Sequence, residues 1–446
     1  MGSPVSKQAP HPSSLEGFED QIRFFERAVR EGGPIIQFPM GPQATGMLVA
    51  SPTGADRVLR VAAEGYPKGP LWAAVGRITG NGLSTNQDLE SWRRQRRRMN
   101  PAFSHGSIEE YIEQVHSVIP PLLDEWAAVA AQSPLIDVTT ALAELTQVVI
   151  LRTLFGSAID ADERKRVGRA LVTALGEITR LQQIADPTAP ISPDAERAIA
   201  FIDSIVGRMA ADYRDRLARG QQSERHLMGQ LIAATDEAGS MSAQQLRDEL
   251  MVSYLAGYET AALTLQWTLF TLTQSPPASS RLDDEISRLG RRTPTYADIR
   301  NMSYLNAVLN EGMRLYPAVP YIPRQRTVER SDEIDGFDVP AGAIIFVGVW
   351  HIQRAEEYWG PDAHLFLPER WLENVERPRA AFLPFSIGNR VCIGEHLSRV
   401  EMALCLIHLR QRFTWHLHKD SEDVLPVAMF TLRPDRNIMM EVASLN

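Results

Sequence analysis

Apolar residues recur at helical spacing through most of the chain between Ile108 and Leu289. Two interruptions divide this stretch, one near Gly220 and one in the proline-bearing segment Asp186–Pro193. Shorter apolar runs bordered by Pro, Gly or Asp predict strands at Gly46–Val49, Glu333–Val339, Ala343–Val349 and Ile438–Val442. The pattern therefore predicts a mainly α fold with a smaller β-containing lobe.

One helix is expected to be much longer than the others. Ser242–Thr273 has no internal break, and about 32 residues at about 1.5 Å each give a helix close to 50 Å long. Gly257, near its middle, weakens the helix by roughly 1 kcal/mol relative to alanine. Beside it, the Thr260 hydroxyl can bond the carbonyl four residues earlier and favour a bend. Glu259 and Thr260 also place an acid next to an alcohol, a pair suited to proton delivery.

Length and charge limit the possible functions. The 446 residues can bury a large core, and no flexible linker divides them, so residues 1–446 are expected to form one domain. A net charge of -9 argues against a nucleic-acid binder. With two cysteines there is no disulfide framework, which fits a reducing cytoplasm. Met1–Ser14 is polar, so neither a signal peptide nor a membrane anchor is expected.

The most informative motif contains one of the two cysteines. The string runs Phe385-Ser-Ile-Gly388-Asn-Arg390-Val-Cys392-Ile-Gly394. A thiolate is a good iron ligand but a costly charge in an apolar site, so backbone donors and a positive dipole must stabilise it. An amphipathic helix is expected to start at the cysteine and direct its positive end at the sulfur. Arg390 is placed to bind a carboxylate. Cys405 lies in the apolar run of that helix and is expected to be core.

The string closely resembles the haem-binding signature of the cytochrome P450 superfamily, the haem-thiolate monooxygenases. Residues 81–432 resemble the family in order and spacing, whereas residues 1–45 match poorly, and the member is expected to be of the soluble bacterial type. The resemblance implies the cytochrome P450 fold, haem b as cofactor and Cys392 as axial iron ligand. It also implies that Phe385 shields the sulfur, that Gly388 and Gly394 let backbone approach the haem, and that Arg390 reaches a propionate.

Further residues resemble other family motifs. Ala256-Gly257-Tyr258-Glu259-Thr260 is similar to the Ala/Gly-Gly-x-Asp/Glu-Thr motif, which implies that Thr260 holds the activated oxygen and Glu259 serves a proton relay. Propionate contacts are implied for Trp92 and Arg96, which match a Trp-x-x-x-Arg pair, for Arg324 and, with a poorer match, for His351. Glu311, Arg314 and Arg370 resemble the family's structural triad, implying a buried cluster that fixes the cysteine loop.

Electrons are expected from a separate ferredoxin-type donor with its own NAD(P)H reductase. Only 54 residues follow Cys392, and they contain no flavin or nicotinamide motif. The arginines near Trp92, which are Arg93, Arg94, Arg97 and Arg98, could form an ordinary solvated basic face, or some of them could dock an acidic donor, because complementary charge steers encounter. A monomer is expected.

The substrate is expected to be uncharged and largely hydrocarbon. Three segments where the family varies, 71–78, 181–191 and 318–322, are mostly apolar here, although such stripes are also ordinary core. The candidate pocket residues are Val252, Leu255, Ala256, Val319, Ile322, Met429 and Phe430. The expected reaction is the oxygen-dependent hydroxylation or further oxidation of a terpenoid, steroid or polyketide. The alternatives are a haem-thiolate peroxygenase or isomerase, against which Glu259-Thr260 argues, and a non-catalytic haem sensor.

Overall fold

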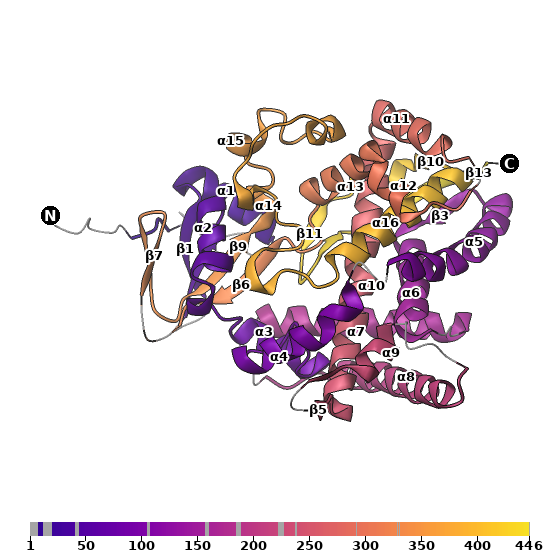
Figure 1. Cartoon of the computed structure of the whole chain (residues 1–446). Coiled ribbons are helices and arrows are strands. Elements are labelled where there is room, and N and C mark those ends of the chain that lie inside the picture. Colours follow the sequence, from indigo (N-terminus) through magenta and orange to yellow (C-terminus); the bar gives the residue numbers. More distant parts are fainter. Residues whose placement is uncertain are drawn as a thin grey trace.

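The computed structural model describes residues 8–11, 20–40, 44–104, 108–156, 160–183, 189–221, 227–236, 239–290, 292–327, 329 and 331–445. Helices form most of the molecule, and a lobe at the N-terminal side carries the largest sheet (Figure 1). The predicted mainly α class is thereby confirmed. Most of the N-terminal segment Met1–Ser14, and 184–188 of the apolar segment 181–191, lie outside the described residues.

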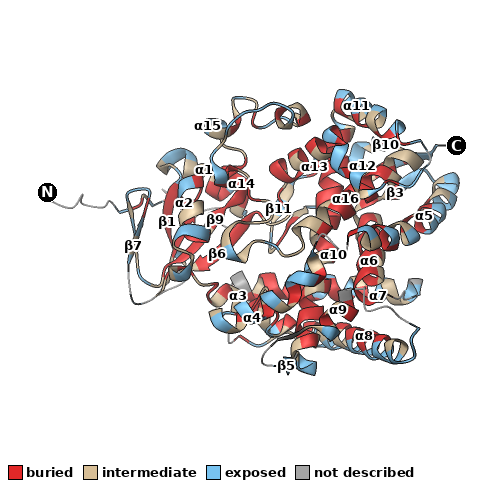
Figure 2. Ribbon diagram, in the orientation of Figure 1, coloured by how far each residue is buried: buried red, intermediate tan, exposed pale blue. Residues whose placement is uncertain are grey.

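The long central helix is α10, Ala243–Thr273, and its bounds agree with the sequence prediction. It begins after Ser242, whose side chain accepts the Gln245 N–H as an N-cap. It runs through the helical body, and most of its side chains from Leu246 to Leu272 are buried (Figure 2). Its neighbours are α6 (Val138–Phe155), α13 (Ser303–Leu315) and α16 (Glu395–Arg412). This helix therefore connects the elements that carry the candidate site.

The predicted breaks between helices are confirmed. Helix α7, Ala161–Gln183, ends before the proline-bearing segment, and α8, Pro193–Ala218, ends before Gly220, which has a φ of 68°. The other α-helices are α1 (Gln21–Gly32), α2 (Pro52–Asp56), α3 (Pro70–Thr79), α4 (Leu89–Met99), α5 (Ile108–Gln132), α9 (Leu227–Ala233), α11 (Pro276–Ser287), α12 (Tyr296–Asn301), α14 (Val349–Ile352) and α15 (Glu356–Trp359).

The largest sheet has the strand order β1-β2-β9-β6, with β2 parallel to β9 and the other pairs antiparallel. A second sheet has the order β10-β13-β3, and three hairpins pair β4 with β5, β7 with β8 and β11 with β12. The strands are β1 (Ile35–Met40), β2 (Ala44–Val49), β3 (Leu135–Asp137), β4 (Thr235–Asp236), β5 (Gly239–Ser240), β6 (Tyr321–Gln325), β7 (Asp332–Ile334), β8 (Phe337–Val339), β9 (Ile344–Gly348), β10 (Phe413–Leu417), β11 (Pro426–Ala428), β12 (Leu432–Pro434) and β13 (Met439–Ser444).

Three of the four predicted strands are present as β2, β9 and β13. The fourth, Glu333–Val339, is wrong as a single strand. Asp335 and Gly336 have positive φ values of 51° and 84°, so the chain turns there and forms the β7–β8 hairpin. No apolar run predicted the remaining strands of the described residues, β1, β3, β4, β5, β6, β10, β11 and β12.

One helix of the described residues, α6, is long and apolar enough to span a membrane by composition. Its side chains pack in the helical core against α10, and 61% of its apolar window is buried. Burial inside the fold therefore accounts for its apolar character.

Candidate functional site

The loop that carries Cys392 is held in a fixed shape by two positive backbone angles. Ser386 has a φ of 64° and Gly388 a φ of 77°. A Cβ at Gly388 would lie 2.2 Å from the Leu59 carbonyl oxygen, so only glycine fits. The Cys392 N–H donates to the Phe385 carbonyl at 3.0 Å, which closes the loop. This arrangement places the thiol just before α16.

Helix α16 begins at Glu395, three residues after the cysteine, which corrects the prediction that the helix starts at Cys392 itself. Burial raises the pKa of the Cys392 thiol, and backbone N–H groups of Gly394 and Glu395 act in the opposite direction. The Cys392 side chain is nevertheless exposed. Cys405, by contrast, is fully buried in the core, as predicted.

Three cations gather near this loop, and we call Lys68, Arg324 and Arg390 the cation cluster. They donate to the backbone carbonyls of Ser84, Pro323 (2.8 Å) and Asn86 (2.9 Å), respectively. Within the described residues none of the three pairs with a carboxylate.

Desolvation lowers the pKa values of all three cations in the cluster. Desolvation and then the charges of Arg324 and Arg390 hold the pKa of Lys68 well below its usual value. Desolvation and the charge of Arg390 lower the pKa of Arg324 to about 10, and desolvation lowers that of Arg390 to about 10. Buried cations without an anion are costly. A ligand that brings carboxylates would remove this cost.

Trp92 and Arg96, both on α4, lie beside the cluster. The Arg390 guanidinium carbon is 4.2 Å from the centre of the Trp92 ring, and the Trp92 indole N–H bonds no described residue. Arg96 donates from Nη1 to the Val391 carbonyl at 2.7 Å, one residue before Cys392. The structure therefore brings together four of the five predicted propionate residues, Trp92, Arg96, Arg324 and Arg390.

His351 has different neighbours. Its Nε2 lies 3.2 Å from the Tyr321 hydroxyl, and its ring packs edge-on against Phe25 of α1. Burial first, and then the charge of Arg354, lower the pKa of His351 to about 3. Its contacts are those of a buried aromatic group, and they include no member of the cation cluster.

The centre of α10 presents Thr260 and Glu259 in different directions. The Thr260 hydroxyl donates to the Ala256 carbonyl at 2.8 Å, the bond that the sequence predicts, while α10 remains one continuous helix. Ala256 is exposed although α10 is otherwise largely buried there. Glu259 is buried, and its carboxylate accepts hydrogen bonds from Arg433 and Thr431 and none from Thr260.

A cytochrome P450 family model matches residues 14–441. The chain belongs to the cytochrome P450 family. It is 30% identical to cyclooctatin synthase of Streptomyces melanosporofaciens over 85% of this chain and 83% of that protein. It is 28% identical to Protein LUTEIN DEFICIENT 5, chloroplastic, of Arabidopsis thaliana over 94% of this chain and 73% of that protein. For 11-oxo-beta-amyrin 30-oxidase of Glycyrrhiza uralensis the identity is 27%, over 83% and 73%. The chain is therefore a P450 monooxygenase with the family's haem-thiolate cofactor.

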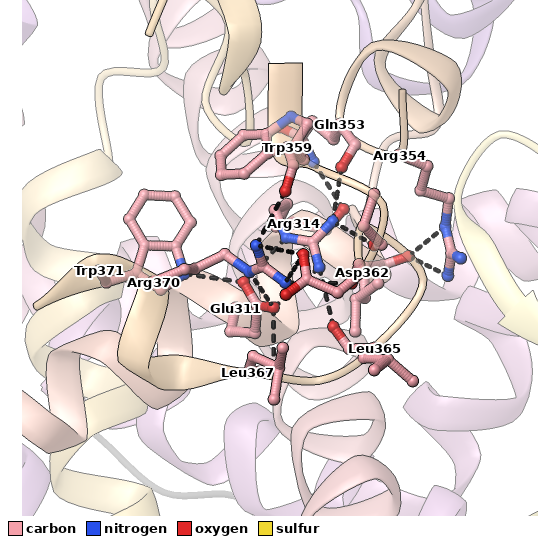
Figure 3. A network of polar contacts seen from close by, with 12 residues as sticks. Glu311, Arg314, Gln353, Arg354, Trp359, Asp362, Leu365, Leu367, Arg370 and Trp371 are labelled. Atoms are coloured by element: carbon pink, nitrogen blue, oxygen red, sulfur yellow. Dashed lines mark hydrogen bonds and ion pairs between the residues drawn. The ribbon is translucent and has the colours of Figure 1, made fainter. Parts of the chain in front are cut away.

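Three charged residues of this P450 form a buried network (Figure 3). Both oxygens of Glu311 bind Arg314 at 2.8 Å, and Arg370 Nε donates to Oε1, also at 2.8 Å. The remaining guanidinium N–H groups of both arginines bond backbone carbonyls and Asp362. The predicted triad therefore exists as a closed set of bonds.

Gln353 extends this network to the cysteine loop. It is completely buried, donates to the carbonyls of Met313 and Arg314, and accepts the Leu383 N–H at 2.7 Å. Leu383 lies at the start of the segment that leads to Cys392. The triad thus reaches the loop through an amide that the sequence analysis did not single out.

The apolar candidates are divided between two hydrophobic clusters and the surface of the P450. Leu255 belongs to the core of helices α3, α6 and α8, and Val252 lies against the position of Gly82. Val319 and Ile322 pack in the core of the main sheet. Met429 is partly exposed, and the Phe430 ring meets Trp72 of α3 edge-on with centroids 6.0 Å apart. A role for these residues in substrate binding stays a prediction.

Proposed function

We propose that Cys392 supplies the thiolate ligand of the haem iron in this P450. Support comes from the accessible thiol beside a closed backbone loop, with Gly394 and Glu395 N–H groups directed at its sulfur. Gly388 keeps the loop in place, and Phe385 packs beneath it with the Arg399 guanidinium 4.9 Å from its ring centre. Cys405 is enclosed by core side chains and has no such setting.

The haem carboxylates would be bound by the cation cluster with Arg96 and Trp92. The observation that carries this proposal is a group of cations without a carboxylate partner among the described residues, of which Lys68 and Arg324 are buried and Arg390 is partly buried. Beside them lies a buried tryptophan, Trp92, whose N–H has no partner there. Haem b has two propionates, and charge-assisted bonds from arginine suit carboxylates. Lys68 is an addition to the set that the sequence predicts.

When bound, the haem supplies oxygen activation, and the protein binds substrate, excludes water and delivers protons. Thr260 and Glu259 are the proposed proton-handling residues. The Thr260 hydroxyl is held by the Ala256 carbonyl and can still accept a bond through its oxygen. Thr260→Ala should consume reductant while releasing hydrogen peroxide instead of product, and unchanged coupling would contradict the assignment.

The first experiment is the carbon monoxide difference spectrum of the dithionite-reduced protein. The parent should give the strongly red-shifted Soret band of a thiolate-ligated haem, and Cys405→Ala should give the same band. Cys392→Ser should lose it. A histidine-type band in the parent would favour a haem sensor, and a retained thiolate band in Cys392→Ser would overturn the ligand assignment.

The proposed substrate is an uncharged terpenoid, steroid or polyketide. The relatives of the chain include a cyclooctatin synthase and an 11-oxo-beta-amyrin 30-oxidase. Four of the five buried side chains of α3 are apolar, Leu71, Ala74, Val75 and Ile78, and the fifth is Thr79. A panel of terpenoids, steroids and polyketides should include compounds that shift the haem spin state, whereas fatty acid anions of similar size should not. The reverse preference would refute the proposed class.

The proposed electron donor is a ferredoxin with a separate NAD(P)H reductase, acting on a monomer in the cytoplasm. Arg93 and Arg94 on α4 are exposed, and their ion pairs are with similarly exposed glutamates, so they remain available to an acidic partner. Such a reaction should slow as ionic strength rises. Replacing both arginines by glutamine should weaken that salt dependence, and an unchanged dependence would place the donor elsewhere.

A further inference from the structure

The buried acid of α10 is held by a hairpin from the far end of the chain. Arg433 of β12 donates from Nε to Glu259 Oε1 at 2.8 Å, and its Nη2 donates to the same oxygen. The Thr431 hydroxyl donates to Oε1 at 3.1 Å. Oε2 receives no bond from a described residue. One oxygen is therefore fixed, and the other is available for proton exchange.

The hairpin is also attached to α10 at a second point. The Trp267 indole N–H donates to the Leu432 carbonyl at 3.0 Å, two helical turns beyond Glu259. Leu432 is completely buried, and its N–H donates to the Ala318 carbonyl at 2.9 Å. Because these bonds fix β12 along the helix, packed backbone sets the position of Arg433.

Arg433 is the single cation paired with Glu259 in the described part of the chain. The Glu259 side chain is only 7% exposed, so the carboxylate depends on this partner for its orientation. Without Arg433 the side chain would lose its ion partner and turn toward water. Oε2 would then leave the position from which it passes protons.

We propose that Arg433 is a positioning residue that keeps Glu259 able to relay protons. The inference rests on the proposed role of Glu259. Oε2 first accepts a proton from water and then passes it toward the reaction, so the carboxylate returns to its starting state and gives up no electrons. Thr431 assists by fixing Oε1.

The test measures how the electrons of consumed reductant divide between product and hydrogen peroxide. It uses the haem-loaded protein, a ferredoxin with its reductase, and the terpenoid or steroid that shifts the spin state most. Glu259→Gln and Arg433→Met should each raise the peroxide share at least about fivefold. The double variant should be no worse than Glu259→Gln alone, because both changes disable one relay.

The matched control is Arg436→Met. Arg436 lies beyond the end of β12 and pairs with Asp423 and Asp435, but it makes no contact with Glu259. It should leave the peroxide share unchanged. Arg433→Lys keeps the charge and should recover most of the coupling, a rescue that loss of packing alone does not predict. Thr431→Val, a milder change should Arg433→Met fail to fold, should raise the peroxide share less.

Amide hydrogen exchange of residues 426–434 provides a readout that does not depend on turnover. Exchange there should rise in Arg433→Met and stay near the parent value in Arg433→Lys. If Glu259→Gln keeps normal coupling, the proposed relay is wrong. If Glu259→Gln uncouples while Arg433→Met behaves like the parent, the relay stands and the role of Arg433 is refuted.

Discussion

Replacing Glu311 by glutamine should destabilise the protein severely. Five N–H groups converge on the carboxylate: three donate to Oε1, from Arg314, Arg370 and Leu367, and two donate to Oε2, from Arg314 and Trp371. A glutamine amide keeps one acceptor oxygen, but its NH2 group faces the two remaining donors. The two guanidinium groups also lose their shared counter-charge.

The expected cost follows from the burial of the network. Glu311 and Arg314 are 0% exposed, and Arg370 is 7% exposed. Removing one partner from a buried ion pair costs about 3 to 5 kcal/mol. This is a decrease of about a hundredfold to several thousandfold in the folding equilibrium, a large part of the about 5 to 15 kcal/mol that stabilises a typical domain.

The assay is urea unfolding followed by tryptophan fluorescence, because Trp359 and Trp371 lie within the network. Asp194→Asn is the control, since Asp194 and Arg197 have the same three-residue spacing but are 80% and 72% exposed. Exposed pairs contribute at most about 1 kcal/mol. A Glu311→Gln variant whose unfolding free energy lies within about 1 kcal/mol of the parent would refute the reasoning.

Three other outcomes are expected. Lys68→Met should weaken haem retention about tenfold or more, because a charge-assisted bond contributes about 1.5 to 3 kcal/mol. The control is Lys165→Met, which removes an exposed lysine and should leave haem retention unchanged. Equal rates of haem transfer from the two variants to apomyoglobin would exclude Lys68 from the site. Gly388→Ala should lower the yield of thiolate-ligated protein, since its Cβ would meet the Leu59 carbonyl at 2.2 Å, and a normal carbon monoxide spectrum at normal yield would contradict this. Burial, and then the charge of His116, lower the pKa of His408 from 6.5 to about 4. Between pH 6.5 and about 4 the unfolded chain therefore binds more protons than the folded chain. The free energy of unfolding should fall by at most about 3 kcal/mol as the pH is lowered through this range. His408→Leu should flatten that part of the stability profile, and an unchanged slope would exclude His408 as its source.

The features that were predicted correctly depend on nearby residues. The bounds of α10, the breaks on either side of α8 and the triad spacing on α13 are set by periodicity, caps and prolines within a few residues. The start of α16 was misplaced because contacts from distant residues fix its preceding loop, including the bond from Arg96 to the Val391 carbonyl.

The site residues that were missed have partners far along the chain. Lys68 meets Arg324 because the Gln325 N–H bonds the Pro67 carbonyl and brings β6 against the loop before α3. Arg433 meets Glu259 only after the C-terminal hairpin packs on α10. No local pattern marks a lysine or arginine for such a role. His351 is the opposite case. It matches a family motif, but its contacts in the structure are with Tyr321 and Phe25 and not with the cation cluster.

The β11–β12 hairpin links two properties that protein engineers usually vary separately. Its turn presents Phe430 to Trp72 and donates the Phe430 N–H to Thr179 of α7, while Arg433, three residues later, binds the acid of α10. Substitutions at the turn should also displace the proposed anchor of Glu259. Libraries built at Phe430, a proposed substrate contact, should therefore be screened for hydrogen peroxide as well as for product, since one short turn carries both proposed roles.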